Sequence, residues 1–206
     1  MKAIVIAGGS LTEPAFYKPF FQQAELVICA DSGYLHCEKL GIRPDLIIGD
    51  FDSSERSGVP EGVPVTRLPV EKDETDLHAC ILYAIDKGAT EILLFGARGT
   101  RLDHSLAAIS LVYMGLMQGV TIRTVDEHNE MFMFQEQAVI PRKEGYKLSL
   151  LPVTPVTGIR AEGVYYPLSG QSMDWGNPYG VSNEFTAEKA TITVESGVLM
   201  AILSRD

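Results

Sequence analysis

Two aspartates stand one residue apart in the segment IIGDFDSS, at Asp50 and Asp52. The apolar residues 46–48 before them are typical of a buried β-strand, in which side chains two positions apart point to the same side. Both carboxylates would then face one way where the strand ends. Two carboxylates about 4 Å apart repel each other by several kcal/mol unless a proton or a cation lies between them. The pair therefore predicts a metal site.

Charged residues also follow other predicted strands or begin predicted helices. Because the carboxyl ends of parallel strands meet at one edge of a sheet, and ligands bind there, we expect these side chains to lie together. A group of carboxylates that contains no Cys and no paired His favours Mg²⁺ over zinc as the bound metal. Arginine side chains and exposed glycine amides beside it are suited to binding a polyphosphate. The residues are Asp31 after ELVICA, Lys72, Asp73 and Asp76 in KDETD, and Gly99, Arg101, Asp103 and His104 in GARGTRLDH.

Each of these residues has a second interpretation when it is taken alone. Asp73 and Asp103 are well placed to cap the helices that follow them. Asp31 with Gly33 could form a turn, and His104 could be an exposed histidine rather than a general base. The coincidence of several such strand ends favours the functional interpretation. The chain has no G-x-x-x-x-G-K-[ST] motif, which argues against a P-loop protein.

Residues 1–125 alternate short apolar runs with longer helical patterns. Short apolar runs without alternation are typical of parallel strands that are covered on both faces. The expected strands are 2–7, 25–30, 45–50, 91–96 and 120–125. Apolar residues at helical spacing predict helices over about 74–87, ended by Gly88, and over about 103–118. The pattern predicts an N-terminal α/β domain with a mainly parallel open sheet.

The helical spacing disappears over residues 126–206. Segments that alternate or cluster as strands, separated by Gly, Pro and Asn turns, predict a C-terminal antiparallel β-sandwich in this domain. The expected strands are 130–136, 146–153, 189–196 and 197–205. Residues 169–180 are rich in turn formers and contain the single tryptophan, Trp175, so we expect a mobile loop there.

Composition narrows the possible environments and partners. The 206 residues are 46% hydrophobic and 21% charged, and no apolar run approaches the roughly 20 residues needed to cross a bilayer. A chain with a net charge of −10 lacks the electrostatic attraction that brings proteins to nucleic acids or anionic membranes. The three cysteines have no metal-type spacing and lie in apolar segments, which favours a reducing cytoplasm.

The motifs together resemble one enzyme family. ADSGYLHCEKLGIRPDLIIGDFDS, KDETD and GARGTRLDH, in this order, closely resemble the thiamine pyrophosphokinases, and GVYYPLS with GVSNEF is similar to the signatures of that family's second domain. The resemblance implies an ATP:thiamine diphosphotransferase, a Mg²⁺-dependent kinase that gives thiamine diphosphate and AMP. It also implies an α/β catalytic domain, a sandwich that binds thiamine, and a homodimer with active sites at the subunit interface.

The resemblance also implies roles for individual residues. The acidic positions that hold magnesium are Asp50, Asp52 and Asp76, which lie near the thiamine hydroxyl and form the catalytic set with Asp31. The R-x-D element at the nucleotide side is Arg101 and Asp103, and Lys72, Gly99 and His104 are also predicted to bind ATP. The thiamine pocket is completed by Ser182 and Asn183. The chain departs from the family at residues 163–166, where Gly-Val-Tyr-Tyr replaces the frequent Gly-Leu-x-Trp; we expect Tyr166 to pack in the sandwich.

Three other functions use part of the same pattern. A diphosphokinase acting on a pterin alcohol would share the metal and ATP elements, but the Ser182–Asn183 pair favours thiamine. A nucleotide or thiamine sensor would be expected to have a damaged acid cluster, whereas this cluster is whole. A metal-dependent phosphohydrolase would let water reach the phosphorus and would not need thiamine. Formation of AMP only when thiamine is added would therefore argue against a phosphohydrolase.

Overall fold

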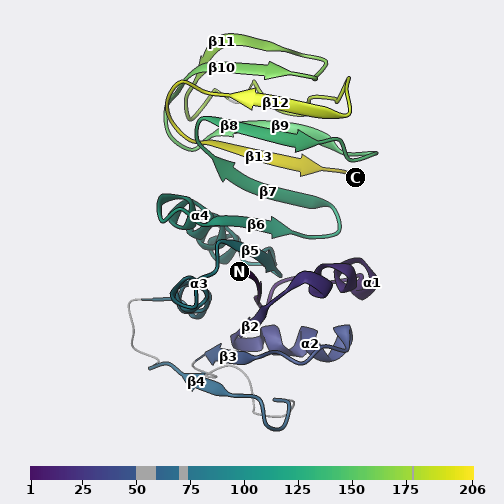
Figure 1. Ribbon diagram of the computed structural model, residues 1–206, viewed down its shortest axis with the longest axis vertical. Coiled ribbons are helices and arrows are strands. Elements are labelled where there is room, and N and C mark those ends of the chain that lie inside the picture. Colours follow the sequence, from purple (N-terminus) through teal and green to yellow (C-terminus); the bar gives the residue numbers. More distant parts are fainter. Residues whose placement is uncertain (50–58, 70–73, 178) are drawn as a thin grey trace. The chain divides into compact units, whose positions relative to one another are not determined.

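A computed structural model describes residues 1–49, 59–69, 74–177 and 179–206. The chain divides into two compact units, residues 1–127 and 128–206, and Figure 1 shows the elements of each. The predicted site residues Asp50, Asp52, Lys72 and Asp73 lie outside the described residues. No helix in the described part of the chain is long and apolar enough to cross a membrane.

The first unit contains a parallel sheet in the order β4-β3-β2-β1-β5-β6. All five predicted strands are present, and β4 is an addition whose three residues are exposed and form no apolar run. Strands β2 to β4 lie on one side of β1, and β5 and β6 lie on the other, so the order reverses between β1 and β5. The strands are β1 Lys2–Ile6, β2 Leu26–Ala30, β3 Leu46–Gly49, β4 Val65–Arg67, β5 Glu91–Phe95 and β6 Thr121–Val125.

Helices cover both faces of this sheet (Figure 1). Alternate strand residues, such as Ile4 and Phe95, share a buried cluster with Tyr17 of α1 and Cys37 of α2. The two predicted helices are α3 and α4, and α3 begins after Thr75, whose hydroxyl accepts the backbone N–H of His78 at 3.2 Å. The helices are α1 Pro14–Tyr17, η1 Lys18–Gln23, η2 Asp31–Gly33, α2 Tyr34–Leu40, α3 Asp76–Asp86 and α4 Leu102–Met117.

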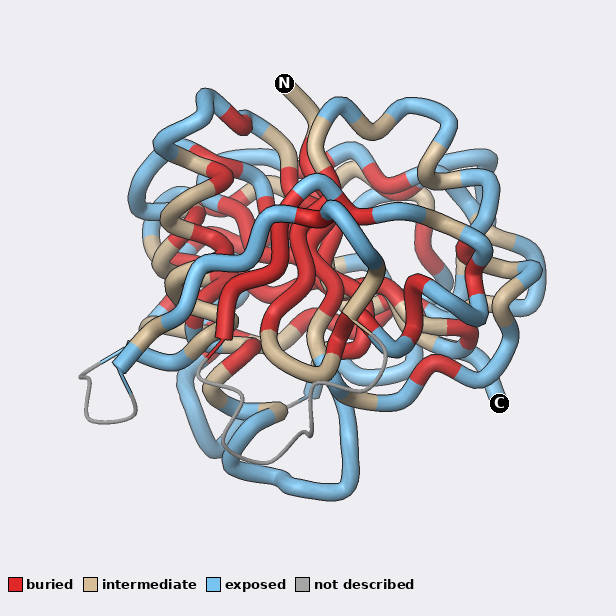
Figure 2. The backbone as a smooth tube through the Cα atoms, turned by 90° about the horizontal axis from the view of Figure 1, so that it is seen from below, coloured by how far each residue is buried: buried red, intermediate tan, exposed pale blue. Residues whose placement is uncertain are grey.

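The second unit contains two layers of antiparallel strands, the set β7-β13-β9 and the four-stranded sheet β11-β10-β12-β8. Side chains from both sheets form one buried cluster, because residues such as Ile140 of β8 and Leu148 of β9 point into it. This is the predicted sandwich. Buried residues concentrate in strands and exposed residues in connections (Figure 2). The strands are β7 Asn129–Phe134, β8 Gln137–Pro141, β9 Lys147–Pro152, β10 Val156–Glu162, β11 Leu168–Met173, β12 Lys189–Thr193 and β13 Leu199–Ser204.

Two expectations for the second unit are wrong. The segment 169–180 is not a loop throughout, because Leu168–Met173 forms β11 and pairs with β10. β11 is an edge strand in which four of the six residues are exposed, so its sequence is polar and resembles that of a loop. Tyr166 does not pack in the sandwich, since 66% of the residue is exposed. The buried residue of that element is Val164, which joins the sandwich core instead.

Candidate active site

A cavity of about 410 Å³ opens at the carboxyl ends of β1, β2 and β5, beside the point where the strand order reverses. In open α/β sheets this crevice is the usual ligand site. The N-terminal ends of α3 and α4 also border it, and helix N-termini attract anions. The predicted site residues that line it are Asp31, Asp76, Gly99, Arg101 and His104.

Asp31 stands directly after β2, in the short helix η2. Its φ of +45° is a left-handed conformation that a non-glycine residue rarely adopts, and such strain occurs often at functional sites. Two glycines allow neighbouring strands to approach this turn. A Cβ on Gly33 would lie 2.1 Å from the carbonyl oxygen of Ile6, and one on Gly49 would lie 2.9 Å from the Cα of Asp31. Asp31 therefore both forms the turn and lines the cavity.

Asp76 is the first residue of α3 and lines the cavity at the start of that helix. The helix is capped by the neighbouring Thr75 rather than by an aspartate. A carboxylate in the first turn is also stabilised by the helix dipole. Asp76 therefore lies at the cavity, at the N-terminal end of α3.

Arg101 and His104 line the cavity from the loop before α4 and from its first turn, while Asp103 lies outside the lining. Arg101 donates to Asp103 through Nε at 3.2 Å and Nη2 at 2.5 Å, and the backbone N–H of His104 donates to Oδ1 at 3.0 Å. The hydrogen bond from Arg101 is the main cause that lowers the pKa of Asp103 to about 2. Asp103 is not the N-cap, because Arg101 occupies that position. Asp103 orients the arginine instead.

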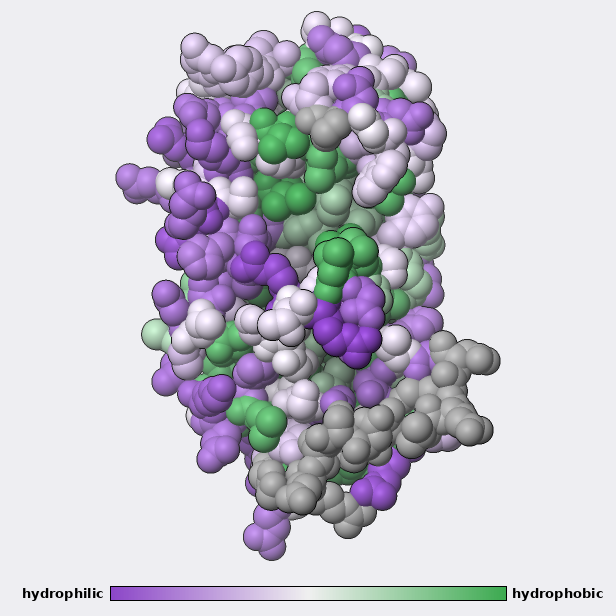
Figure 3. All heavy atoms as spheres, turned by 180° about the vertical axis from the view of Figure 1, so that it is seen from behind, coloured by the Kyte–Doolittle hydropathy of each residue, from purple (hydrophilic) through white to green (hydrophobic). Residues whose placement is uncertain are grey.

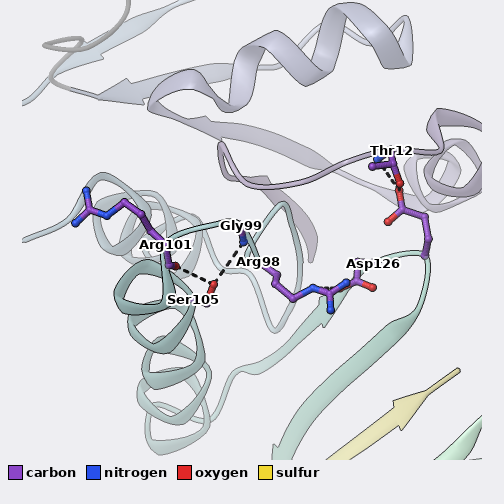
Figure 4. Close-up of polar contacts among 7 residues, drawn as sticks. Thr12, Arg98, Gly99, Arg101, Ser105 and Asp126 are labelled. Carbon is purple, nitrogen blue, oxygen red and sulfur yellow. Dashed lines mark hydrogen bonds and ion pairs between the residues drawn. The ribbon is translucent and has the colours of Figure 1, made fainter. Parts of the chain in front are cut away.

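The loop between β5 and α4 is fastened to the helix by a serine that the sequence argument missed. The Ser105 hydroxyl donates to the carbonyl oxygen of Arg101 at 3.2 Å and accepts the backbone N–H of Gly99 at 3.4 Å (Figure 4). Gly99 and Arg101 both line the cavity, and Figure 4 shows the Arg101 side chain pointing away from Gly99 and Ser105. The short hydroxyl side chain thus fixes the backbone from which Arg101 projects.

Glycines at the end of β1 form another part of the cavity wall. Gly8 and Gly9 follow β1 and line the cavity, yet motif reasoning did not select them. A glycine pair directly after a predicted strand is the signal that could have found them. An apolar side of the same cavity comes from Leu77 of α3 and Leu111 of α4. The cavity therefore combines exposed backbone, charges and an apolar wall.

Two carboxylates line the cavity and are of the chemical type that binds magnesium. Asp31 and Asp76 line the same cavity, and carboxylates are the ligands that Mg²⁺ prefers. Within the described ranges, no group of three or more His, Cys, Asp or Glu side chains is arranged to hold a metal ion. In the sequence, Asp50 and Asp52 follow Gly49, whose backbone packs against Asp31.

The predicted thiamine residues Ser182 and Asn183 belong to the second unit. Asn183 is 8% exposed, and its amide is used within the protein. Its Oδ1 accepts the backbone N–H groups of Tyr166 at 2.9 Å and Glu184 at 3.0 Å, while Nδ2 donates to the carbonyl oxygen of Tyr166 at 2.8 Å. Ser182 has a φ of +60°, and its backbone N–H donates to Ser149 Oγ at 3.0 Å.

A charged cavity at the switch point of a parallel sheet, bordered by two helix N-termini, is typical of α/β proteins that bind phosphorylated ligands. Sequence comparison narrows the class. The family described as "Thiamin pyrophosphokinase, catalytic domain" matches residues 17–124, and "Thiamin pyrophosphokinase, vitamin B1 binding domain" matches residues 136–199. The chain belongs to the thiamin pyrophosphokinase family.

Individual relatives agree with this assignment. Thiamine pyrophosphokinase of Bacillus subtilis (strain 168) is 30% identical over 214 residues, with both chains covered completely. Thiamine pyrophosphokinase 1 of Arabidopsis thaliana is 27% identical, covering 97% of this chain and 85% of its own. The crystal structure of the Bacillus subtilis enzyme superimposes with a TM-score of 0.92 and 28% identity, covering 100% of each chain. These similarities extend over both units.

Proposed function

We propose that this protein transfers the pyrophosphoryl group of ATP to the hydroxyl group of thiamine, giving thiamine diphosphate and AMP. The observation that carries the proposal is the cavity that Asp31, Asp76 and Arg101 line beside two helix N-termini, in a chain whose two halves match the family's two domains. The cavity offers cationic and backbone groups for phosphates and carboxylates for a metal or an alcohol.

The N-terminal cavity binds the triphosphate in this proposal. Arg101 grips phosphate oxygens, and the backbone around Gly99 allows a close approach because glycine has no side chain. His104 borders the same region and, with Lys72, contributes to ATP binding. Asp103 holds the Arg101 guanidinium at 2.5 Å from its carboxylate, which limits the orientations of that side chain before ATP arrives. A preoriented arginine loses less conformational entropy on binding.

The acids prepare the reacting alcohol and hold Mg²⁺. When bound, Mg²⁺ neutralises charge on the triphosphate, and it would be held by Asp50, Asp52 and Asp76 with Asp31 nearby. Asp76 orients the thiamine hydroxyl and accepts its proton as the oxygen attacks the β-phosphorus of ATP. The bond from that phosphorus to the α-phosphate oxygen breaks, and AMP leaves. Positioning and electrostatics supply most of the catalysis in such reactions.

In this proposal the second unit carries residues that bind thiamine. Asn183 shapes this region through the backbone of Tyr166, which it holds by hydrogen bonds in both directions. Tyr165 and Tyr166 are exposed, and their rings make an edge-to-face contact with centroids 4.9 Å apart. Exposed aromatic rings beside a polar anchor suit a flat, cationic ligand such as thiamine. Ser182 and Asn183 are thus assigned to thiamine binding.

The protein acts as a cytoplasmic homodimer with the active site at the subunit interface in this proposal. Large apolar or aromatic side chains of the second unit are exposed, including Tyr166, Trp175 and Val181, and hydrophobic side chains are visible on its surface in Figure 3. Exposed patches of this kind are often buried by a partner. Cys29, Cys37 and Cys80 are free thiols, as expected in a reducing compartment. A monomeric mass by light scattering at micromolar concentration, with full activity, would refute the dimer.

An acceptor assay tests the reaction directly. Purified protein with ATP and Mg²⁺ should form AMP when thiamine is added and not in its absence. Equal AMP formation without any acceptor would identify a phosphohydrolase, and preference for a pterin alcohol would identify a different diphosphokinase. Either result would refute the proposed function.

A further inference from the structure

The loop after β1 forms one wall of the cavity and packs too tightly for side chains. A Cβ on Gly9 would lie 2.2 Å from the carbonyl oxygen of Gly96 and 2.4 Å from that of Arg98. The backbone N–H of Gly9 donates to the Gly96 oxygen at 2.9 Å, and that of Ser10 donates to the Arg98 oxygen at 2.7 Å. This loop is therefore joined to the loop that carries Gly99 and Arg101.

A buried carboxylate from a distant part of the chain holds the far end of the same loop. Oε1 of Glu127 accepts the backbone N–H of Thr12 at 2.7 Å, the Thr12 hydroxyl at 3.0 Å and the backbone N–H of Glu13 at 2.8 Å. Glu127 is only 4% exposed. Three donors on one oxygen of a buried carboxylate form a strong anchor, because hydrogen bonds to charged groups are stronger than neutral ones.

The residue before Glu127 holds the neighbouring loop in a similar way. Asp126 pairs with Arg98 at 3.3 Å, and Figure 4 shows these side chains meeting below the loop while Thr12 points to its own partner. Neither Asp126 nor Glu127 is part of the cavity lining. Two adjacent carboxylates after β6 thus fasten two cavity loops from outside, where they do not contact a bound anion.

We propose that Glu127 is a positioning residue for the phosphates of ATP, because its carboxylate holds residues 7–13 so that the Gly8–Gly9 backbone keeps its place in the cavity wall. The inference rests on the proposed function for the identity of the ligand. Backbone at a glycine can approach phosphate oxygens closely, but only while the loop stays in one conformation. Release of the anchor lets the loop sample other conformations, which lowers the affinity for ATP.

Glu127→Gln tests the proposal with Glu25→Gln as its matched control. Glu25 accepts the backbone N–H of Lys2 at 2.9 Å and so anchors the opposite end of β1. Binding of a non-hydrolysable ATP analogue with Mg²⁺, measured by calorimetry, should weaken about tenfold or more in Glu127→Gln. Glu25→Gln should stay within about twofold of the wild type. In the acceptor assay, Glu127→Gln should raise the KM for ATP and leave the KM for thiamine nearly unchanged.

A pair of Thr12 variants keeps the test decisive if Glu127→Gln does not fold. Thr12→Val removes the hydroxyl donor, whereas Thr12→Ser retains it. Thr12→Val should weaken analogue binding several-fold, whereas Thr12→Ser should bind the analogue like the wild type. Unchanged binding in Glu127→Gln, or in Thr12→Val when Glu127→Gln does not fold, would overturn the proposal. The proposal would also be overturned if Glu25→Gln lost as much affinity for the analogue as Glu127→Gln while the two variants showed the same decrease of melting temperature.

The binding measurement also separates this inference from the proposed reaction. A wild-type protein that binds the analogue but forms no AMP with thiamine would refute the proposed function, while the Glu127→Gln comparison would still decide the role of Glu127. A wild-type protein that does not bind the analogue would overturn both. A protein with thiamine-dependent AMP formation and no loss in Glu127→Gln would refute the positioning role alone.

Discussion

Asp76 in the first unit and Asn183 in the second are both predicted ligand residues, yet their side chains have different surroundings. Asp76 lines a cavity, and the neighbouring Thr75 caps the helix in its place. Asn183 is buried, and its amide groups bind the backbone of Tyr166 and Glu184. In the α/β unit the polar residue lines a cavity, whereas in the sandwich it holds the backbone of neighbouring residues in place.

The difference follows from the two architectures. A parallel sheet ends all its strands at one edge, so its loops and helix N-termini offer polar groups to a shared crevice. A sandwich buries the inner faces of its sheets, so a polar side chain there must find partners within the protein. The same comparison predicts that variants in the first unit change the chemistry, and that variants in the second change stability and thiamine binding together.

The largest effect is expected for Asp76→Asn. The variant keeps the size of the side chain but removes the charge that would hold Mg²⁺ and accept the alcohol proton. Turnover should fall at least about a hundredfold, as when one electrostatic contact to a transition state is lost. The melting temperature should change little, because Thr75 caps the helix. Asp86→Asn at the other end of α3 is the control; high activity in Asp76→Asn would remove this residue from the site.

A smaller effect is expected for Arg101→Ala. Its side chain is 66% exposed, so removal should leave stability nearly unchanged while raising the KM for ATP by about tenfold or more. The pKa of Asp103 should rise toward its usual range, because the hydrogen bond from Arg101 is the main cause that lowers it. Nuclear magnetic resonance titration measures this shift. Wild-type kinetics for ATP would show that Arg101 contacts solvent rather than phosphate, and Lys87→Ala is the matched control.

The elements that sequence predicts well are those with a local signal. Residues 3–6 of strand β1 form an uninterrupted apolar run, and α4 repeats apolar residues at helical spacing. Strand β4 was missed because all three of its residues are exposed. Strand β8 was missed because only Ala138 and Ile140 point into the core, which is too short an alternation to recognise.

The site residues divide in the same way. The position of Asp31 and Asp76 at the cavity was predictable, because a strand end and a helix start mark them in the sequence. The role of Gly9 depends on the carbonyl oxygens of Gly96 and Arg98, which approach only in the folded chain. The contact of Thr12 with Glu127 joins residues 115 positions apart, and no local pattern announces it. Long-range packing therefore decides which residues support the site.

The second unit should respond differently to Asn183→Ala. Loss of the amide leaves backbone groups of Tyr166 and Glu184 without their partners, which typically costs about 1–3 kcal/mol for a buried group. We expect a several-fold higher KM for thiamine and an unchanged KM for ATP. Asn183→Asp replaces the donor to the Tyr166 carbonyl oxygen with a buried carboxylate oxygen that repels it, so its effects should be at least as large. Equal effects on both substrates would contradict the division between the units.

The smallest effect is a dependence of stability on acid that originates in the first unit. Burial alone would raise the pKa of Glu127, but hydrogen bonds from the backbone N–H groups of Glu13 and Thr12 oppose it, and the pKa is lowered from 4.5 to about 2. A carboxyl whose pKa is lower in the folded state stabilises the protein above its unfolded pKa, and this contribution is lost as the pH falls. The melting temperature should therefore decrease from about pH 4.5 to pH 2, and less steeply in Glu127→Gln. If the melting temperatures of the wild type and Glu127→Gln decreased in parallel as the pH falls, the Glu127 carboxylate would contribute nothing to the stability of the fold, and a role in ATP binding would be separate from stability.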